Sequence, residues 1–259
     1  TQQLSDALLP QTRAFHEVWA LDPATGEKEL VGGGSDGKEI EPLYGKSYLP
    51  RKFKTAVALP EDNCTDVYTN DLGFVAECEG EKIVGYDVLV GGGFGITPSN
   101  ANTFPALAQP LAFVEPDEVV DVAAAIIKVQ RDFGNRSDRK RARMKYLIHD
   151  WGLDRFRQKV QEYYGKPLSE PHRLDVRRVE HHLGWQEQGD GRWFYGLNVE
   201  NGRIADTDDC RLKSALYEIC RQYGPPVRIT AYQSLIFCDV GPEDRAGIDV
   251  EFRAAFDLP

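Results

Sequence analysis

The sequence predicts an α+β fold in two units, residues 1–182 and 183–259. In the first unit, short runs of β-branched and aromatic residues precede two runs with the apolar spacing of helices. In the second unit, one strand, one helix and two further strands follow each other. The stretch 166–182 has two prolines, many charges and few apolar residues, so we expect a linker there. A chain of 259 residues with 41% hydrophobic residues is long enough to bury a sizeable core.

Turn-forming residues bound the expected strands of the first unit. We expect four of these strands, at 12–20, 53–59, 72–78 and 83–90. Residues 116–118 suit the first turn of a helix, and apolar residues then recur at helical spacing as far as Val129. A second helix, 154–164, is expected to end at Gly165.

The second unit has the pattern of half of a small α+β sandwich. We expect a strand at 193–199, a helix at 212–223, and strands at 227–231 and 235–240. Gly224 and the two prolines after it form a strong stop for the helix. A helix that packs on a small sheet in this way buries one apolar face of each.

Charge and cysteine usage exclude several kinds of protein. The net charge of 31 − 41 = −10 repels nucleic acid and anionic membranes, so we expect neither as a partner. Any bound anion must therefore be held by a local basic site. The five cysteines are odd in number and have no C-x-x-C spacing, so we expect this chain to build no metal site. Free thiols and the absence of a signal-peptide pattern favour the reducing cytoplasm.

The first basic cluster lies in the segment 44–54. Pro50 begins an extended stretch in which Lys52 and Lys54 are expected on one face, and Arg51 and Phe53 on the other. Neighbouring lysines repel each other unless they face solvent or an anion. Spacing alone leaves two interpretations open: a solvated strand face, or an anion site in which lysine also donates protons.

The second basic cluster is the segment 136–145, which has six basic residues and one acid. If it is helical, Arg139 and Arg143 lie one turn apart on the same face. Such a run can bind carboxylates or phosphates, lie in solvent, or contact nucleic acid. The glycine run 91–95 follows a strand but lacks both the dinucleotide and the Walker spacing, so a tight turn with a close backbone approach is an equal alternative.

Several stretches, in this order along the chain, resemble the haemoprotein family of assimilatory sulfite and nitrite reductases. They are 49–54 (Leu-Pro-Arg-Lys-Phe-Lys), 85–93, 130–139, 198–204 and 227–230. The resemblance extends from about Arg13 to Val240. It implies a sirohaem-domain-like mixed sheet flanked by helices in residues 1–182, then the second half of a two-part ferredoxin-like module in residues 183–259. The implied cofactors are sirohaem, a tetrapyrrole with many carboxylates, and an adjacent 4Fe-4S cluster.

The resemblance also implies roles for individual residues. Lys52 and Lys54 match the lysines that face the substrate anion, where they would hold sulfite and supply protons. Nitrite-reducing relatives tend to carry Asn where this chain has Lys54, which favours sulfite. Arg51, Arg143 and Arg139 match positions that bind sirohaem carboxylates.

Two departures from the family pattern lead to further expectations. The resemblance implies that Gln233 contacts the haem, although it lies in a loop, 230–234, where the family usually has Asn on both sides of the Gln. The paired cysteines that bind the cluster have no match, and an N-terminal half-module is missing. We therefore expect a central piece of a longer enzyme that is inactive by itself.

The expected function is the reduction of sulfite to sulfide with electrons from ferredoxin or a flavoprotein. The stretches 151–157 and 163–166 look more like the ferredoxin-dependent branch. Three alternatives are a ferredoxin-nitrite reductase, a nucleic-acid-binding module that uses Arg136–Lys145, and a non-catalytic tetrapyrrole carrier.

Overall fold

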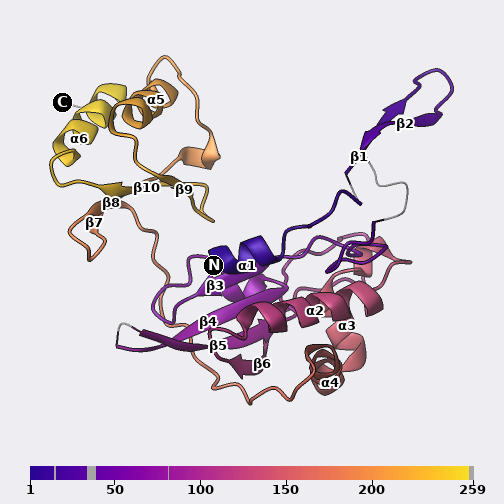
Figure 1. Cartoon of the computed structure of the whole chain (residues 1–259). Coiled ribbons are helices and arrows are strands. Elements are labelled where there is room, and N and C mark those ends of the chain that lie inside the picture. The colour runs from indigo at the N-terminus through magenta and orange to yellow at the C-terminus, as the bar shows by residue number, and fades with distance from the viewer. Residues whose placement is uncertain (15, 34–38, 81, 257–259) are drawn as a thin grey trace. The chain divides into compact units, whose positions relative to one another are not determined.

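The computed structural model describes residues 1–14, 16–33, 39–80 and 82–256 and divides into two units, Thr1–Arg177 and Arg178–Pro259 (Figure 1). Both units combine a sheet with helices, which confirms the predicted α+β class. The units separate a few residues before the expected join at residue 182. None of the helices in the described ranges has the length and apolar content that a bilayer crossing requires.

A mixed four-stranded sheet forms the centre of the first unit. Its strands lie in the order β3 (Thr55–Ala58), β4 (Leu72–Glu79), β5 (Lys82–Val90) and β6 (Gln109–Val114). β3 pairs with β4 in parallel, and the other two pairs are antiparallel. The middle of the sheet is buried because β4 and β5 present apolar side chains to both faces.

Three helices pack on one face of this sheet. They are α2 (Val119–Phe133), α3 (Met144–Trp151) and α4 (Leu153–Tyr164), and their apolar residues share a core with Phe74 and Val88. The apolar positions predicted at helical spacing in α2 are all buried, which confirms that prediction. A smaller cluster on the opposite side of the sheet is formed by residues such as Val75 and Leu89.

Two elements differ from the prediction for local reasons. β6 was not predicted, because its run contains Pro110; as an edge strand it tolerates a residue without an amide hydrogen. The expected strand at 12–20 begins later, as β1 (Glu17–Leu21), which pairs with β2 (Lys28–Gly33). Thr12 is outside the strand because its amide and hydroxyl both donate to the buried carboxylate of Glu41.

The basic segment 136–145 is not one helix, so the shared helical face predicted for Arg139 and Arg143 is wrong. Residues Arg139–Arg141 form a single 3₁₀ turn, and α3 starts only after Arg143, whose backbone is extended. Side chains explain the break. Asn135 Oδ1 accepts from two backbone amides, and Asp138 accepts from the amide of Lys140, so both side chains compete with helical hydrogen bonds.

The second unit is an antiparallel sheet with two helices. The strand order is β7 (Gly184–Glu187), β8 (Trp193–Leu197), β10 (Leu235–Val240) and β9 (Val227–Ile229). The predicted helix is α5 (Leu212–Tyr223) and matches the expected bounds, as does β10. β7 and the last helix, α6 (Arg245–Ala255), were not predicted. Phe237, Ile219 and Phe252 belong to the core between helices and sheet.

The glycine run after β5 lets three backbone segments approach each other closely. The amides of Gly91, Gly92 and Gly93 donate to the carbonyls of Asp71, Asn70 and Ala106 at 2.8–2.9 Å. These amides are therefore not available to a phosphate, and the close-approach interpretation is confirmed. A Cβ atom on Gly92 would lie 2.3 Å from the carbonyl oxygen of Tyr68 and 2.5 Å from that of Asn70.

We predict that Gly92→Ala lowers the free energy of unfolding of the first unit by about 2 kcal/mol, because backbone atoms must move apart to admit the methyl group. Gly95→Ala is the matched control, since a Cβ atom there has no neighbour within 4 Å, and its effect should stay within about 0.5 kcal/mol. Native-state hydrogen exchange of the β4 and β5 amides measures this unit alone. Equal effects of the two substitutions would contradict the close-approach argument.

Candidate functional site

Six cationic side chains from distant parts of the chain line one pocket of about 620 Å³ in the first unit. They are Arg51, Lys52, Lys54, Arg139, Lys140 and Arg143. The exposed apolar side chains of Phe94 and Ile96 also line the pocket, and Asp66 is an acidic residue of the lining. The structure therefore brings together all the predicted site residues of the first unit.

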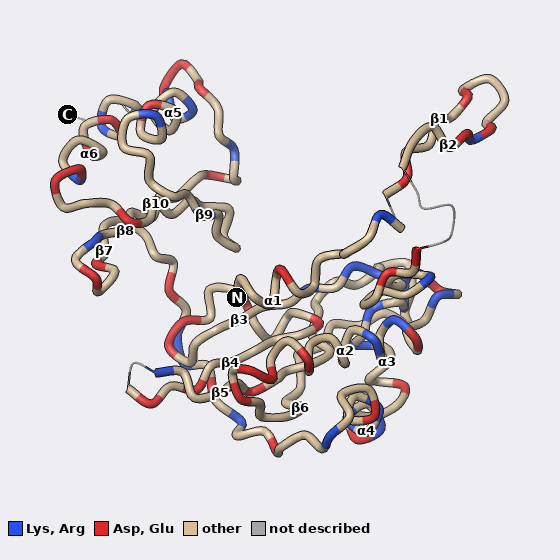
Figure 2. The backbone as a smooth tube through the Cα atoms, viewed as in Figure 1, with Lys and Arg blue, Asp and Glu red and all other residues tan. Residues whose placement is uncertain are grey.

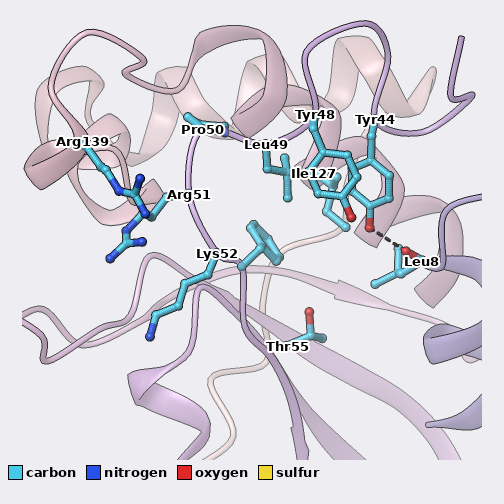
Figure 3. Close-up of a pocket in the computed structure, with 11 residues that line it drawn as sticks. Leu8, Tyr44, Tyr48, Leu49, Pro50, Arg51, Lys52, Thr55, Ile127 and Arg139 are labelled. Atoms are coloured by element: carbon cyan, nitrogen blue, oxygen red, sulfur yellow. Dashed lines mark hydrogen bonds between the residues drawn. The ribbon is translucent and has the colours of Figure 1, made fainter. Parts of the chain in front are cut away.

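A neighbouring hollow of about 560 Å³ shares Arg51, Lys52 and Arg139 with this pocket. In Figure 3, the guanidinium groups of Arg51 and Arg139 lie next to each other, and Lys52 extends away from the stacked rings of Tyr44 and Tyr48. We name the two hollows together the basic pocket. Adjacent guanidinium groups repel each other, so this arrangement favours an anion between or above them.

The expectation that Arg51 lies on the opposite face from Lys52 and Lys54 is wrong, since all three line the same pocket. The reason is local. Residues 51–54 precede β3, whose first paired residue is Thr55, so the alternation of a paired strand does not apply to them.

The loop before this segment is held by exposed and part-buried polar contacts. The side chain of Arg136 donates to the carbonyls of Ser47 and Tyr48, and Arg131 Nη1 donates to the carbonyl of Leu43 at 2.7 Å. Tyr44 donates its hydroxyl hydrogen to the Leu8 carbonyl at 2.6 Å, which is the dashed line in Figure 3. Burial raises the pKa of Tyr44 to about 12, so this hydroxyl stays a donor at neutral pH.

Glu41 fixes the N-terminal segment to the same loop. Its carboxylate is fully buried and accepts hydrogen bonds from the amides of Gln11 and Thr12 and from the Thr12 hydroxyl, at 2.8–3.0 Å. Burial alone would raise the pKa of Glu41, but these donors outweigh it and hold that pKa below its usual value. The charged carboxylate is thus part of the scaffold behind the basic pocket.

Asp71 is the site residue that the sequence analysis missed. Its side chain is 1% exposed and forms a two-point ion pair with Arg143, at 3.2 Å from Nε and 2.9 Å from Nη2. Asp71 Oδ2 also accepts the amide of Lys54 at 3.0 Å. No motif marks Asp71, because its partners lie 17 and 72 residues away in sequence.

Lys145 does not face the basic pocket, although it belongs to the basic segment. It is buried, and its ammonium group donates to the carbonyls of Gly93 and Gly95 at 2.9 Å and to that of Phe104. Burial, together with the nearby charge of Arg143, lowers the pKa of Lys145. This lysine orders the loop after β5 and is not available to a ligand.

Two further cations of the basic segment 136–145 also have partners. Arg141 pairs with Asp150 at 2.9 Å, and Arg136 binds the carbonyls described above. Across the described ranges, by contrast, no hydrogen-bond or ion-pair partner is found for five of the pocket's side chains. These are Arg51, Lys52, Lys54, Arg139 and Lys140. In Figure 2, blue segments gather around the connection between α2 and α3.

This arrangement can bind a flat, acidic ligand. Unpaired guanidinium and ammonium groups bind carboxylates through charge-assisted hydrogen bonds, and Phe94 and Ile96 offer apolar contact beside them. The concentration of positive charge is local, since the chain as a whole carries −10.

Gln233 belongs to the second unit, and its predicted haem contact remains a prediction. It is exposed in the turn between β9 and β10 and has a left-handed backbone, with φ of 64°. Its Cβ lies 3.1 Å from where a Cβ on Gly202 would be, so the turn lies against the loop at 200–202. The loop at 200–202 belongs to a stretch on which the family resemblance rests, whereas the turn at 230–234 is where the chain departs from the family pattern.

The five cysteines do not fit a four-iron cluster. Cys64 and Cys78 lie in the first unit, and Cys210, Cys220 and Cys238 in the second; all are free thiols. Within the described ranges, no set of three cysteines lies within ligand distance of one another. This chain therefore does not supply the sulfur ligands that such a cluster needs.

Comparisons with known proteins agree with the resemblance. The relatives include the sulfite reductase [ferredoxin] of Synechococcus elongatus, which is 43% identical over 96% of this chain. The NADPH sulfite reductase hemoprotein beta-component of Staphylococcus haemolyticus is 42% identical over 95% of it. The chain spans 42% of the length of each of these two proteins. The structure of the Mycobacterium tuberculosis NirA protein matches with a TM-score of 0.67 and 32% identity, over 80% of this chain and 36% of that one.

Two family models cover the two units. The nitrite and sulphite reductase 4Fe-4S domain matches residues 5–168, more than half of the chain, and the nitrite/sulfite reductase ferredoxin-like half domain matches residues 186–255. The second match agrees with the half-module expected there. The chain belongs to the nitrite and sulphite reductase family.

Proposed function

We propose that this chain forms the anion-binding side of a sirohaem centre that reduces sulfite to sulfide. The observation that carries the proposal is the set of unpaired cations, with two exposed apolar side chains, on the basic pocket of a nitrite and sulphite reductase family member. The relatives are named as sulfite reductases that use ferredoxin or NADPH, which supports sulfite as the substrate and ferredoxin or a flavoprotein as the electron donor.

The residues of the basic pocket fit sirohaem by their chemistry. Arg51 and Arg139 have planar guanidinium groups that can each bind a carboxylate at two points, and neither has a partner elsewhere in the described ranges. Phe94 and Ile96 can contact the apolar ring. When bound, sirohaem supplies the iron through which electrons reach the sulfur.

Lys52 and Lys54 are the proposed substrate residues. Both are exposed on the pocket, so their ammonium groups can attract sulfite and can regain protons from solvent. Each oxygen of sulfite that leaves as water takes up protons, and a lysine beside it can donate them. Positive charge fixed at this position also stabilises the negative charge that accumulates as sulfite is reduced.

The 4Fe-4S cluster of the family would take its cysteine ligands from residues outside this sequence, because the cysteines present do not fit it. We therefore propose that the chain by itself binds but does not reduce sulfite. Five free thiols support a reducing, cytoplasmic location.

Two alternatives lose support. A nucleic-acid surface along Arg136–Lys145 needs exposed, unpaired cations, but four of the segment's basic residues are held by carbonyls or carboxylates. A non-catalytic tetrapyrrole carrier would explain Arg51 and Arg139, but it would not need two lysines beside them. A carrier would also need no 4Fe-4S cluster, whereas the family model that matches residues 5–168 is that of a 4Fe-4S domain.

The cofactor side of the proposal predicts that Arg139→Ala weakens sirohaem binding to this chain by about tenfold, because one charge-assisted contact to a carboxylate is lost. An optical titration of the chain with sirohaem measures the affinity. Lys82→Ala is the matched control: it also removes one exposed cation, but at the far end of β5, roughly 25 Å from the glycine run. Equal affinities of the two variants would contradict the assignment of the pocket.

The main alternative within the family is nitrite reduction, and Lys54 separates the two substrates. In the sirohaem-loaded whole enzyme, Lys54→Asn should lower kcat/KM for sulfite by more than tenfold and leave that for nitrite much less changed, because sulfite carries the greater negative charge. Steady-state assays with both anions provide the measurement. Unchanged sulfite turnover would overturn the assignment of sulfite to this lysine.

A further inference from the structure

We propose that Asp71 is a positioning residue: its buried carboxylate fixes the main chain of Lys54 and the guanidinium group of Arg143 at the basic pocket. The inference rests on the proposed function only for the identity of the anion that Lys54 meets. The positioning itself is argued from contacts within the first unit.

Asp71 joins three segments that are distant in sequence. Its Oδ2 accepts the Lys54 amide at 3.0 Å and Arg143 Nη2 at 2.9 Å, while Oδ1 accepts Arg143 Nε at 3.2 Å. Its main-chain oxygen accepts the Gly91 amide at 2.9 Å. Arg143 Nη2 also donates to the carbonyl of Gly92 at 3.0 Å. Asp71 thus links the approach to β3 with the start of α3 through its carboxylate, and it holds the residue after β5 through its main-chain oxygen.

The peptide groups of Lys54 are held from both sides. Its amide donates to Asp71, and its carbonyl accepts the Leu72 amide at 3.0 Å. The side chain of Lys54 has no partner of its own within the described ranges. The direction in which this side chain enters the pocket is therefore set by the main chain, and Asp71 supplies half of the main-chain contacts that set it.

Only a carboxylate satisfies all these donors together. An amide at position 71 would present an NH₂ group either to Arg143 Nε or to the Lys54 amide and Arg143 Nη2, and donors would then face donors. If Arg143 is removed, however, the amide oxygen can accept the Lys54 hydrogen without this conflict. This difference separates the two functions of Asp71.

Charge and position predict opposite effects on anion binding. Loss of Asp71 removes a negative charge beside the pocket, so electrostatics alone would tighten sulfite binding. The positioning role predicts weaker binding instead, because Lys54 is no longer held. Comparing Arg143→Ala with the double variant Asp71→Ala/Arg143→Ala isolates this effect, since both lack the guanidinium group.

The test measures amide exchange and sulfite binding in the whole chain by NMR. In Asp71→Ala/Arg143→Ala, the Lys54 amide should exchange about tenfold faster than in Arg143→Ala. The rescue variant Asp71→Asn/Arg143→Ala should restore slow exchange, because its amide oxygen replaces the acceptor. The Val88 amide in the centre of the sheet is the internal control for an intact fold.

Sulfite is then titrated while the side-chain signals of Lys54 and Lys52 are followed. The double alanine variant should bind sulfite about tenfold more weakly than Arg143→Ala. The rescue variant should bind it at least as tightly as Arg143→Ala, because it restores the acceptor and lacks the negative charge. Equal Lys54 exchange in all three variants, or tighter sulfite binding by the double alanine variant, overturns the positioning role. If the exchange contrast holds but no sulfite shift is seen even in the unmodified chain, Asp71 stands as a positioning residue and the proposed sulfite site fails.

Discussion

Repulsion between like charges is the constraint on which this structure depends. Five cationic side chains share one pocket without a partner among the described residues, and such an arrangement is unfavourable unless the surrounding chain holds it in place. The fold does this with other cations. Arg131, Arg136, Arg143 and Lys145 bind main-chain carbonyls or a buried carboxylate, and so fix the loops from which the unpaired cations project.

This division of roles explains why the scaffold is polar where a core would usually be apolar. Asp71 and Glu41 are both buried acids, and each accepts several donors from segments that are distant in sequence. Buried charges are tolerated when they are fully hydrogen-bonded, and they then favour one geometry over others. The basic pocket is thus preorganised before any anion arrives, which lowers the cost of binding it.

The sequence predicts the architecture and the composition of the site better than its geometry. The runs in β4 and β5 and the apolar spacing in α2 depend on local pattern, and they were predicted for that reason. Which cations are free could not be predicted, because it depends on partners far away in sequence. Arg139 and Arg143 look equivalent in the sequence, yet one is unpaired and the other is bound to Asp71.

In the proposed function, the unpaired cations of the basic pocket select the cofactor more than apolar contact does. The most direct test compares the binding of sirohaem to this chain with that of its fully methyl-esterified form, which keeps the ring and removes the negative charges. We expect the ester to bind at least tenfold more weakly and to lose the salt dependence that charge pairing confers. Equal affinity for the two forms at every salt concentration would contradict it.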